Sequence, residues 1–92
     1  MRIIWSSTAR GDVDRLYEFL ARHDLDAADR IFDRLIEAPE TLLDFPRRGS
    51  RVERYAPRDV REFRVGDYLL RYELAGGNIF VVRFFHGREN RF

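Results

Sequence analysis

The sequence predicts a small α+β domain in which one β-strand is followed by two helices and then by three strands. Three observations support this β-αα-βββ order. Two consecutive segments have apolar residues at helical spacing, three later segments read as strands, and glycine-containing turns separate those strands. A chain of 92 residues has room for one core, so residues 1–92 are assigned to a single domain. We expect a mostly antiparallel sheet with a helical hairpin packed on one face.

The first strand and the first helix meet at a polar cluster. Residues 2–5 are β-branched and aromatic, which favours a strand. The Ser-Ser-Thr cluster that follows is a helix-start signal, and we expect the helix from Ala9 to about His23. Its apolar stripe has i, i+3, i+4, i+7 spacing and consists of Val13, Leu16, Tyr17 and Leu20.

A second amphipathic helix follows a short break, where Asp24 or Asp26 can serve as the N-cap. Pro39 lacks an amide donor and clashes with the carbonyl of Leu35, so the helix should kink or restart there. The apolar pattern continues until Pro46 ends it. Because the turn between the two helices is short, they should form an antiparallel hairpin.

The last part of the chain predicts a loop and three strands. Residues 46–58 are rich in Gly, Pro and Arg, and the strands are expected at 60–65, 68–74 and 79–86. The last run is almost continuously apolar, which is typical of a central strand covered on both sides. Arg83 lies in that run, in phase with Ile79, Val81 and Phe85, and needs a carboxylate partner such as Glu62 or Glu73.

Charge is unevenly placed although the net charge is only +1. Residues 12–46 have ten acids and four arginines, whereas residues 47–64 have seven arginines and three acids. One face should therefore be positive, and its partner is a target protein, nucleic acid or an acidic segment. Every basic residue is arginine, which suits carboxylate or phosphate contacts but also follows from codon bias in a GC-rich genome.

Composition excludes several classes of protein. The chain has no cysteine and two distant histidines, so we expect no disulfide, no metal site and no cofactor. The N-terminus does not resemble a signal peptide, and no apolar run approaches the ~20 residues that span a bilayer. We expect a cytoplasmic protein without a membrane partner.

Four segments, taken in order, resemble the RelE/ParE toxins. They are IIWSSTARGDVDRLYEFL, AADRIFDRLIEAPETLLDFPRRGSR, REFRVGDYLLRYEL and IFVVRFFHGRENR. The resemblance covers essentially the whole chain and implies the toxin of a type II toxin–antitoxin system, held silent by an antitoxin from the neighbouring gene. It also implies one of two activities: RelE-like members cut messenger RNA on the ribosome, and ParE-like members inhibit DNA gyrase.

RNA cleavage needs a general base, cations for the phosphorane and an acid for the leaving oxygen. When the chain is laid against RNA-cutting members, three positions that are usually basic hold Val60, Glu62 and Leu69, and only Arg88 matches a basic catalytic position. In a second style of RNA-cutting member His86 matches, but Leu69 and Gly87 replace an arginine and a tyrosine. These differences favour a non-enzymatic, ParE-like gyrase inhibitor with a ParD-like antitoxin.

Two alternatives stay open. One is a ribosome-dependent endoribonuclease that uses Arg61, His86 and Arg88; the other is a non-toxic relative that only binds an antitoxin. For target binding, whether of gyrase or directly of nucleic acid, the candidate residues are Arg51, Arg58, Arg83, His86, Arg88 and Arg91.

Each candidate also has a simpler interpretation. His86 can be a histidine at a strand end that hydrogen-bonds to the backbone. Arg83 can form a structural ion pair, and the loop arginines can be an ordinary solvated surface. The tail that ends at Phe92 suits a frayed terminus. For the antitoxin, the resemblance implies assemblies with even numbers of each chain, and an amphipathic helix should enter an apolar groove. The candidate groove residues are Leu16, Tyr17, Leu20, Leu35 and Phe45.

Overall fold

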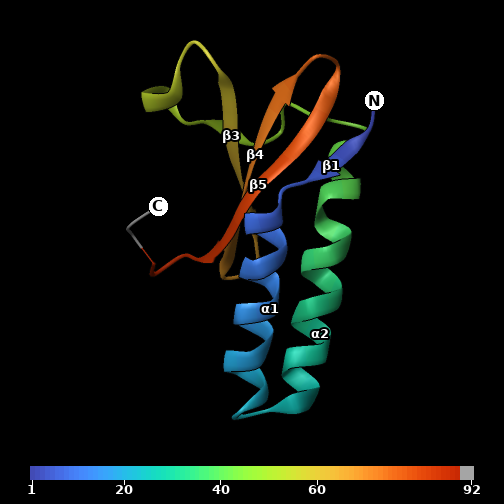
Figure 1. Ribbon diagram of the computed structural model, residues 1–92, viewed down its shortest axis with the longest axis vertical. Coiled ribbons are helices and arrows are strands. Elements are labelled where there is room, and N and C mark those ends of the chain that lie inside the picture. Colours follow the sequence, from blue (N-terminus) through green and yellow to red (C-terminus); the bar gives the residue numbers. More distant parts are fainter. Residues whose placement is uncertain (90–92) are drawn as a thin grey trace.

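A computed structural model describes residues 1–89, in which two helices cover one face of a five-stranded sheet (Figure 1). The predicted α+β class and the β-αα-βββ order are confirmed. The elements in chain order are β1 (Ile3–Trp5), α1 (Ser7–Ala21), α2 (Leu25–Glu37), the 3₁₀ turn η1 (Ala38–Leu42), β2 (Ser50–Arg51), the 3₁₀ turn η2 (Glu53–Tyr55), β3 (Asp59–Val65), β4 (Tyr68–Ala75) and β5 (Asn78–His86).

The strands lie in the order β1-β5-β4-β3-β2. Among the strands within residues 1–89, only the β1–β5 pair is parallel, so the expectation of a mostly antiparallel sheet is confirmed. The strand β5 lies between β1 and β4, as its apolar sequence predicted, but the helices cover only one of its faces (Figure 1). The two-residue strand β2 and the turn η2 were not predicted, and both lie inside the segment expected to be a loop.

Side-chain caps fix where each helix begins. The Ser6 hydroxyl accepts a hydrogen bond from the Ala9 amide at 2.9 Å, so α1 begins two residues before the predicted start. The Asp24 carboxylate accepts from the Ala27 amide at 3.0 Å and caps α2. The predicted restart at Pro39 is confirmed, because α2 ends at Glu37 and Pro39 lies in the first turn of η1.

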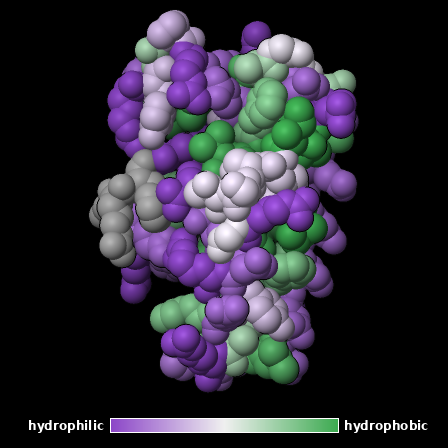
Figure 2. Space-filling model, viewed as in Figure 1, coloured by the Kyte–Doolittle hydropathy of each residue, from purple (hydrophilic) through white to green (hydrophobic). Residues whose placement is uncertain are grey.

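The core lies between the helical hairpin and the sheet. Its largest fully buried side chains are Leu35, Pro39, Leu42, Leu70, Tyr72, Ile79, Val81 and Phe84. The far end of the hairpin extends past the sheet (Figure 1), which leaves Phe19 and Leu25 more than half exposed. Hydrophobic side chains also gather at the surface near β1 (Figure 2), where Ile4, Trp5, Phe80 and Val82 line a shallow depression. No helix within residues 1–89 is long and apolar enough to cross a membrane.

An irregularity in β5 corrects one prediction. Arg83 pairs with Arg71 and Val81 pairs with Tyr72, so the strand has an extra residue, Val82, between its two paired neighbours. Ile79, Val81 and Phe84 therefore all belong to the core. Arg83 and Phe85 lie on the opposite face, called the open face below, and the prediction that they share a face with Ile79 and Val81 is wrong.

The loop before β2 is anchored to the core by a buried tyrosine. The Tyr72 hydroxyl donates to the Pro46 carbonyl at 2.7 Å and accepts from the Gly49 amide at 2.9 Å. A Cβ atom on Gly49 would lie 2.7 Å from that hydroxyl and 2.9 Å from the carbonyl oxygen of Glu62. Glycine is therefore required where the loop approaches the sheet.

Candidate functional site

A polar pocket of about 440 Å³ lies where the β3–β4 turn meets the end of β5. It brings together two residues that the sequence singled out, His86 and Arg88, with one that it did not, Arg64. The Arg64 guanidinium donates to the carbonyl of Gly66 at 3.3 Å and stays exposed. Among residues 1–89, Asp67 is the one acidic residue that lines the pocket, against two arginines. The pocket thus suits an anionic group of a partner.

His86 is held by the turn that follows β5. Its Nδ1 accepts a hydrogen bond from the Arg88 amide at 3.1 Å, as expected for a histidine bonded to backbone at a strand end. Its ring packs edge-on against Tyr68 at a centroid distance of 5.2 Å. Burial raises the pKa of the Tyr68 phenol, and the charges of Asp67 and Glu89 raise it further. Tyr68 is therefore a poor general base at neutral pH.

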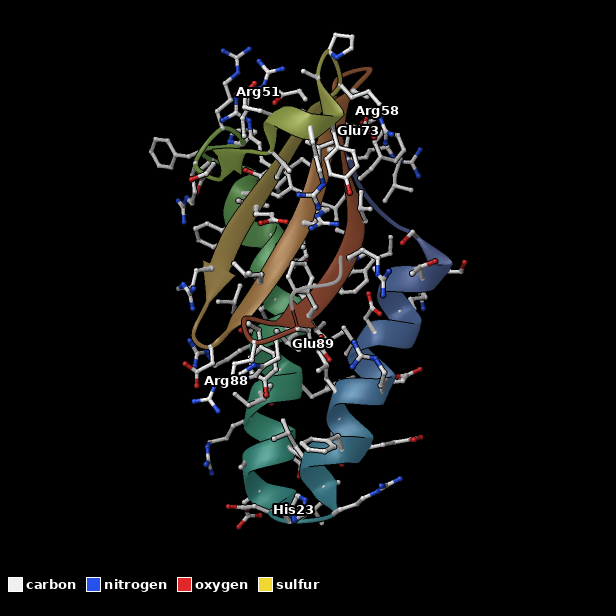
Figure 3. The ribbon with its side chains drawn as sticks, turned by 90° about the vertical axis from the view of Figure 1, so that its left-hand side faces the viewer. His23, Arg51, Arg58, Glu73, Arg88 and Glu89 are labelled. Atoms are coloured by element: carbon white, nitrogen blue, oxygen red, sulfur yellow. The ribbon has the colours of Figure 1, made fainter. Side chains whose placement is uncertain are left out.

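The same turn is tied to α1 by Glu89. This carboxylate accepts from the His86 amide at 3.0 Å and from the Arg15 guanidinium at 2.7 Å. Figure 3 shows Glu89 beside Arg88 at the end of the sheet nearest the middle of the hairpin. These contacts fix the point from which the chain leaves β5, and so they orient Arg88.

Arg83 forms the predicted structural ion pair, but its carboxylate partner comes from a helix. Its Nε donates to Asp12 Oδ2 at 2.8 Å and its Nη2 donates to Oδ1 at 3.0 Å. The hydrogen bond with Asp12 raises the pKa of the Arg83 guanidinium. The expected partners Glu62 and Glu73 are wrong, because each pairs with a different arginine.

Those two carboxylates neutralise arginines on the open face. Arg71 is buried, with 5% of its surface exposed. Its guanidinium donates to Glu62 at 2.8 Å and lies over the rings of Tyr55 and Phe85. The Arg58 guanidinium donates hydrogen bonds to both oxygens of the second carboxylate, Glu73, at 3.0 and 2.6 Å. The hydrogen bond with Arg58 lowers the pKa of Glu73. The centre of the open face is thus built of internal ion pairs.

The other predicted target-binding residues lie away from the pocket. Figure 3 places Arg51 and Arg58 at the opposite end of the sheet from Arg88. Arg51 is 3.8 Å from the Asp59 carboxylate in β3. Arg91 and Phe92 lie outside the described residues.

Of the three residues considered for RNA cleavage, Arg61 lies apart from His86 and Arg88. Arg61 pairs in register with Tyr72, whereas His86 pairs with Tyr68, four residues away along β4. That separation is about 13 Å along the strand. The Arg61 guanidinium donates instead to Asp59 at 2.9 Å and to the carbonyls of Arg47 and Gly49 at 3.0 Å.

The predicted antitoxin-binding residues divide into buried and exposed ones. Leu16 and Leu35 are core residues, 5% and 2% exposed, so a partner does not reach them in this conformation. Tyr17 is half-buried and packs edge-on against Phe32, and Leu20 is half-buried too. Phe45 is 65% exposed.

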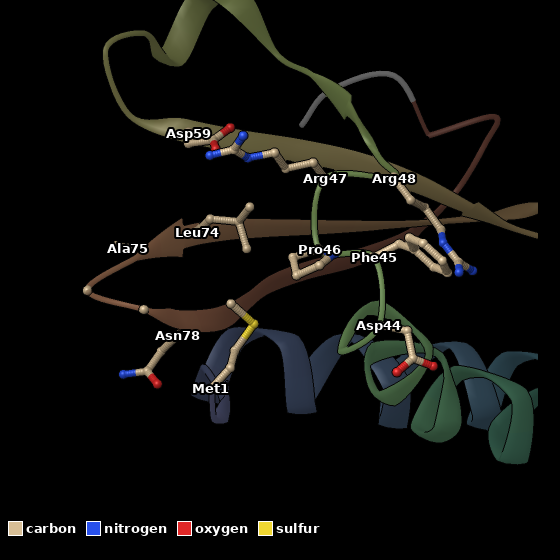
Figure 4. A pocket seen from close by; sticks show the side chains of 12 residues that line it. Met1, Asp44, Phe45, Pro46, Arg47, Arg48, Asp59, Leu74, Ala75 and Asn78 are labelled. Atoms are coloured by element: carbon tan, nitrogen blue, oxygen red, sulfur yellow. The ribbon is translucent and has the colours of Figure 1, made fainter.

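Phe45 lines a groove of about 790 Å³ between the N-terminus, the loop at 44–48 and the β4–β5 hairpin (Figure 4). Its apolar walls are Met1, Phe45, Pro46 and Leu74, and Arg47 and Arg48 lie on its rim. Gly76 and Gly77 form the hairpin tip with φ of 56° and 75°, so the groove has no side chains there. Sequence periodicity did not identify this groove, because loops and chain ends form it.

Comparison with known proteins agrees with this fold. The sequence model of one protein family, the ParE toxin of the type II toxin–antitoxin system parDE, matches residues 3–91. Toxin RelE1 of Caulobacter vibrioides is 33% identical over 89 residues, which cover 97% of this chain and 96% of the relative. Toxin RelE2 of the same organism is 30% identical over 86 residues, covering 92% and 93%. The solved structure described as the chromosomal ParDE TA system from P. aeruginosa has a TM-score of 0.78 at 18% identity, over 94% of this chain and 95% of that one.

The fold and these matches define a small toxin of the RelE/ParE superfamily. Within it, the chain belongs to the family of ParE toxins of type II toxin–antitoxin systems. Family membership supports an antitoxin as its partner.

Proposed function

We propose that this toxin inhibits DNA gyrase and that a ParD-like antitoxin neutralises it. The observation that supports inhibition by binding rather than RNA cleavage is the separation of Arg61 from His86. General acid–base catalysis needs groups within hydrogen-bond reach of the same reacting atoms. Tyr68, which packs against His86, has a raised pKa and would not act as a general base at neutral pH.

The charge arrangement limits which arginines can contact a target. A ribonuclease needs cations that are free to stabilise a phosphorane, but Arg58, Arg71 and Arg83 each bond to a carboxylate of the same chain. The exposed cations Arg64 and Arg88 lie at the pocket beside His86. We propose that this pocket and the tail that follows it contact gyrase.

For the antitoxin, we propose that an amphipathic helix covers the groove around Phe45, with Tyr17 and Leu20 as further contacts. An exposed aromatic side chain at the edge of a groove is typical of an interface anchor. The complex should contain even numbers of each chain, and a toxin directed at gyrase acts in the cytoplasm.

A gyrase supercoiling assay with purified toxin tests the proposal. Wild-type protein should stabilise cleaved DNA, Arg88→Glu should weaken this effect, and Arg22→Glu, an exposed arginine at the end of α1, should leave it unchanged. Unchanged supercoiling at excess toxin would contradict the proposal.

The ribonuclease remains the second candidate, because two relatives are named RelE toxins. Ribosome profiling after induction distinguishes the two candidates, since codon-phased cuts in messenger RNA would overturn the gyrase proposal. Induction without growth arrest in cells lacking the antitoxin would instead indicate a non-toxic, antitoxin-binding relative.

A further inference from the structure

The strand β3 is only partly covered at the edge of the sheet. On that side β2 pairs with Arg61 and Glu62 and then ends. The remaining residues of β3, Phe63 to Val65, pair with β4 on the other side only. An uncovered edge of this kind offers backbone donors and acceptors to an added strand.

Strand alternation identifies the backbone groups that face outward. The Val60 carbonyl accepts from the Val52 amide at 2.8 Å, so the backbone groups of Val60 point toward the β2 side. Backbone direction alternates along a strand, so Glu62 and Arg64 point the same way. The amide and carbonyl of Arg64 therefore face the open edge.

A groove of about 350 Å³ follows this edge, between β3 on one side and α2 and η1 on the other. Its floor includes Ala38, Phe63 and Val65, which are buried or half-buried. Arg34, Arg48 and Arg64 line it and are all exposed, and Glu37 is its one acidic residue.

These arginines differ from those of the open face. Among residues 1–89, none of the three forms an ion pair. The Arg34 guanidinium lies beside Gly66, 3.3 Å from where a Cβ would stand. Arg48 lies over the rings of Phe45 and Phe63, at 5.5 and 5.4 Å, and so connects this groove with the one in Figure 4.

We propose that an extended acidic segment of the antitoxin adds to the sheet here, antiparallel or parallel to β3. Its backbone would bond to the amide and carbonyl of Arg64, its alternate apolar side chains would contact Phe63 and Val65, and its carboxylates would reach Arg34, Arg48 and Arg64. Positive charge at the edge selects this occupant, because it repels a second copy of the same edge and attracts an acidic strand.

The segment would also control access to the target. Arg64 lines both this groove and the pocket that contains His86 and Arg88. A carboxylate bound to Arg64 removes one of the two arginines of that pocket from any other anion. The binding site stands on the described geometry alone, whereas this consequence for the target rests on the proposed function.

A synthetic peptide that alternates glutamate and valine tests the site without gyrase. It should bind the full-length toxin with an affinity that falls as salt rises. In amide hydrogen exchange, Arg64 should become protected when the peptide is bound. Arg64→Glu and Arg34→Glu should each weaken binding about tenfold or more, whereas the exposed Arg22→Glu should not.

A matched peptide with alternate backbone amides methylated separates charge from strand pairing. It keeps every carboxylate but cannot form the edge hydrogen bonds, so it should bind much more weakly. Equal binding of both peptides, unprotected Arg64, or binding of a single-stranded oligonucleotide in place of the peptide would each overturn the proposal. A toxin that binds the peptide but leaves supercoiling unchanged would count against the gyrase proposal alone.

Discussion

Asp12 and Arg83 are 71 positions apart in the chain and form a two-pronged ion pair between α1 and β5. One oxygen of Asp12 also accepts from the Phe84 amide at 3.0 Å. The carboxylate therefore closes part of the β5 edge that the short strand β1 does not reach, and it holds the helical hairpin to the sheet.

Replacing Asp12 by alanine should lower the free energy of unfolding by about 2–4 kcal/mol, because it removes three charge-assisted hydrogen bonds from a buried carboxylate. Asp12→Asn keeps an acceptor for the Phe84 amide and should cost less. Asp14→Ala, an exposed acid on the same helix, is the control. Urea denaturation measures all three, and equal losses for Asp12→Ala and Asp14→Ala would contradict the assigned role.

Replacing Tyr72 by phenylalanine should lower the free energy of unfolding by about 1–3 kcal/mol, because the Gly49 amide and the Pro46 carbonyl lose their buried partner. Hydrogen exchange at the Gly49 amide should speed up with it. Tyr17→Phe removes an exposed hydrogen bond to Asp29 and should change stability by less than about 0.5 kcal/mol. Unaltered exchange at Gly49 would show that the loop is held by other contacts.

The ion pair of Arg58 and Glu73 should make the free energy of unfolding depend on pH in the acidic range. The pKa of Glu73 is lower in the folded chain than in the unfolded one, where it is about 4.3. The contribution of the pair is therefore complete above that value and is lost as pH falls through the folded-state pKa.

Glu73→Gln should accordingly be less stable than wild type at pH 7, and the difference should shrink as pH falls through the folded-state pKa of Glu73. Glu18→Gln, an exposed position on α1, serves as the control. Urea unfolding from pH 7 downward is the measurement, and a constant difference between Glu73→Gln and wild type would refute the linkage.

Replacing Phe45 by alanine should weaken antitoxin binding about 30-fold, as expected for an aromatic anchor worth about 2 kcal/mol. Stability should change by less than about 0.5 kcal/mol, because the ring is mostly exposed. Phe19→Ala, an equally exposed ring near the far end of α1, should leave binding intact. Calorimetric titration with the antitoxin measures both affinities. Equal affinities of the two variants would contradict the role of Phe45 as the anchor.

Local patterns were enough to predict most of the fold. Helical spacing, the Ser-Ser-Thr start signal, a cap at Asp24 or Asp26 and the break at Pro39 are properties of neighbouring residues, and the structure confirms them, with Ser6 and Asp24 as the caps. The phase of Arg83 was predicted wrongly because the extra residue at Val82 shifts the alternation, and an extra residue leaves no mark on the pattern of an apolar strand.

The candidate site was less predictable, since it depends on contacts between distant segments. His86 and Arg88 were found because they follow a strand in a recognisable order. Arg64 was missed because only the closing of the β3–β4 turn onto the end of β5 brings it to them. The partner of Arg83 lies on a helix rather than on a neighbouring strand, so strand pairing alone pointed to the wrong carboxylates.

Two stretches of strand that their short neighbours leave uncovered are not equivalent. Where β5 extends past β1, the amides of Phe84 and His86 already bond to Asp12 and Glu89, whereas where β3 extends past β2 the backbone groups of Arg64 are uncovered. Endless polymerisation through sheets requires a receptive border at both sides of every molecule. The stretch of β5 beyond β1 is closed by these carboxylates, so a strand edge presented at Arg64 of one toxin finds no receptive partner on that stretch of a second toxin.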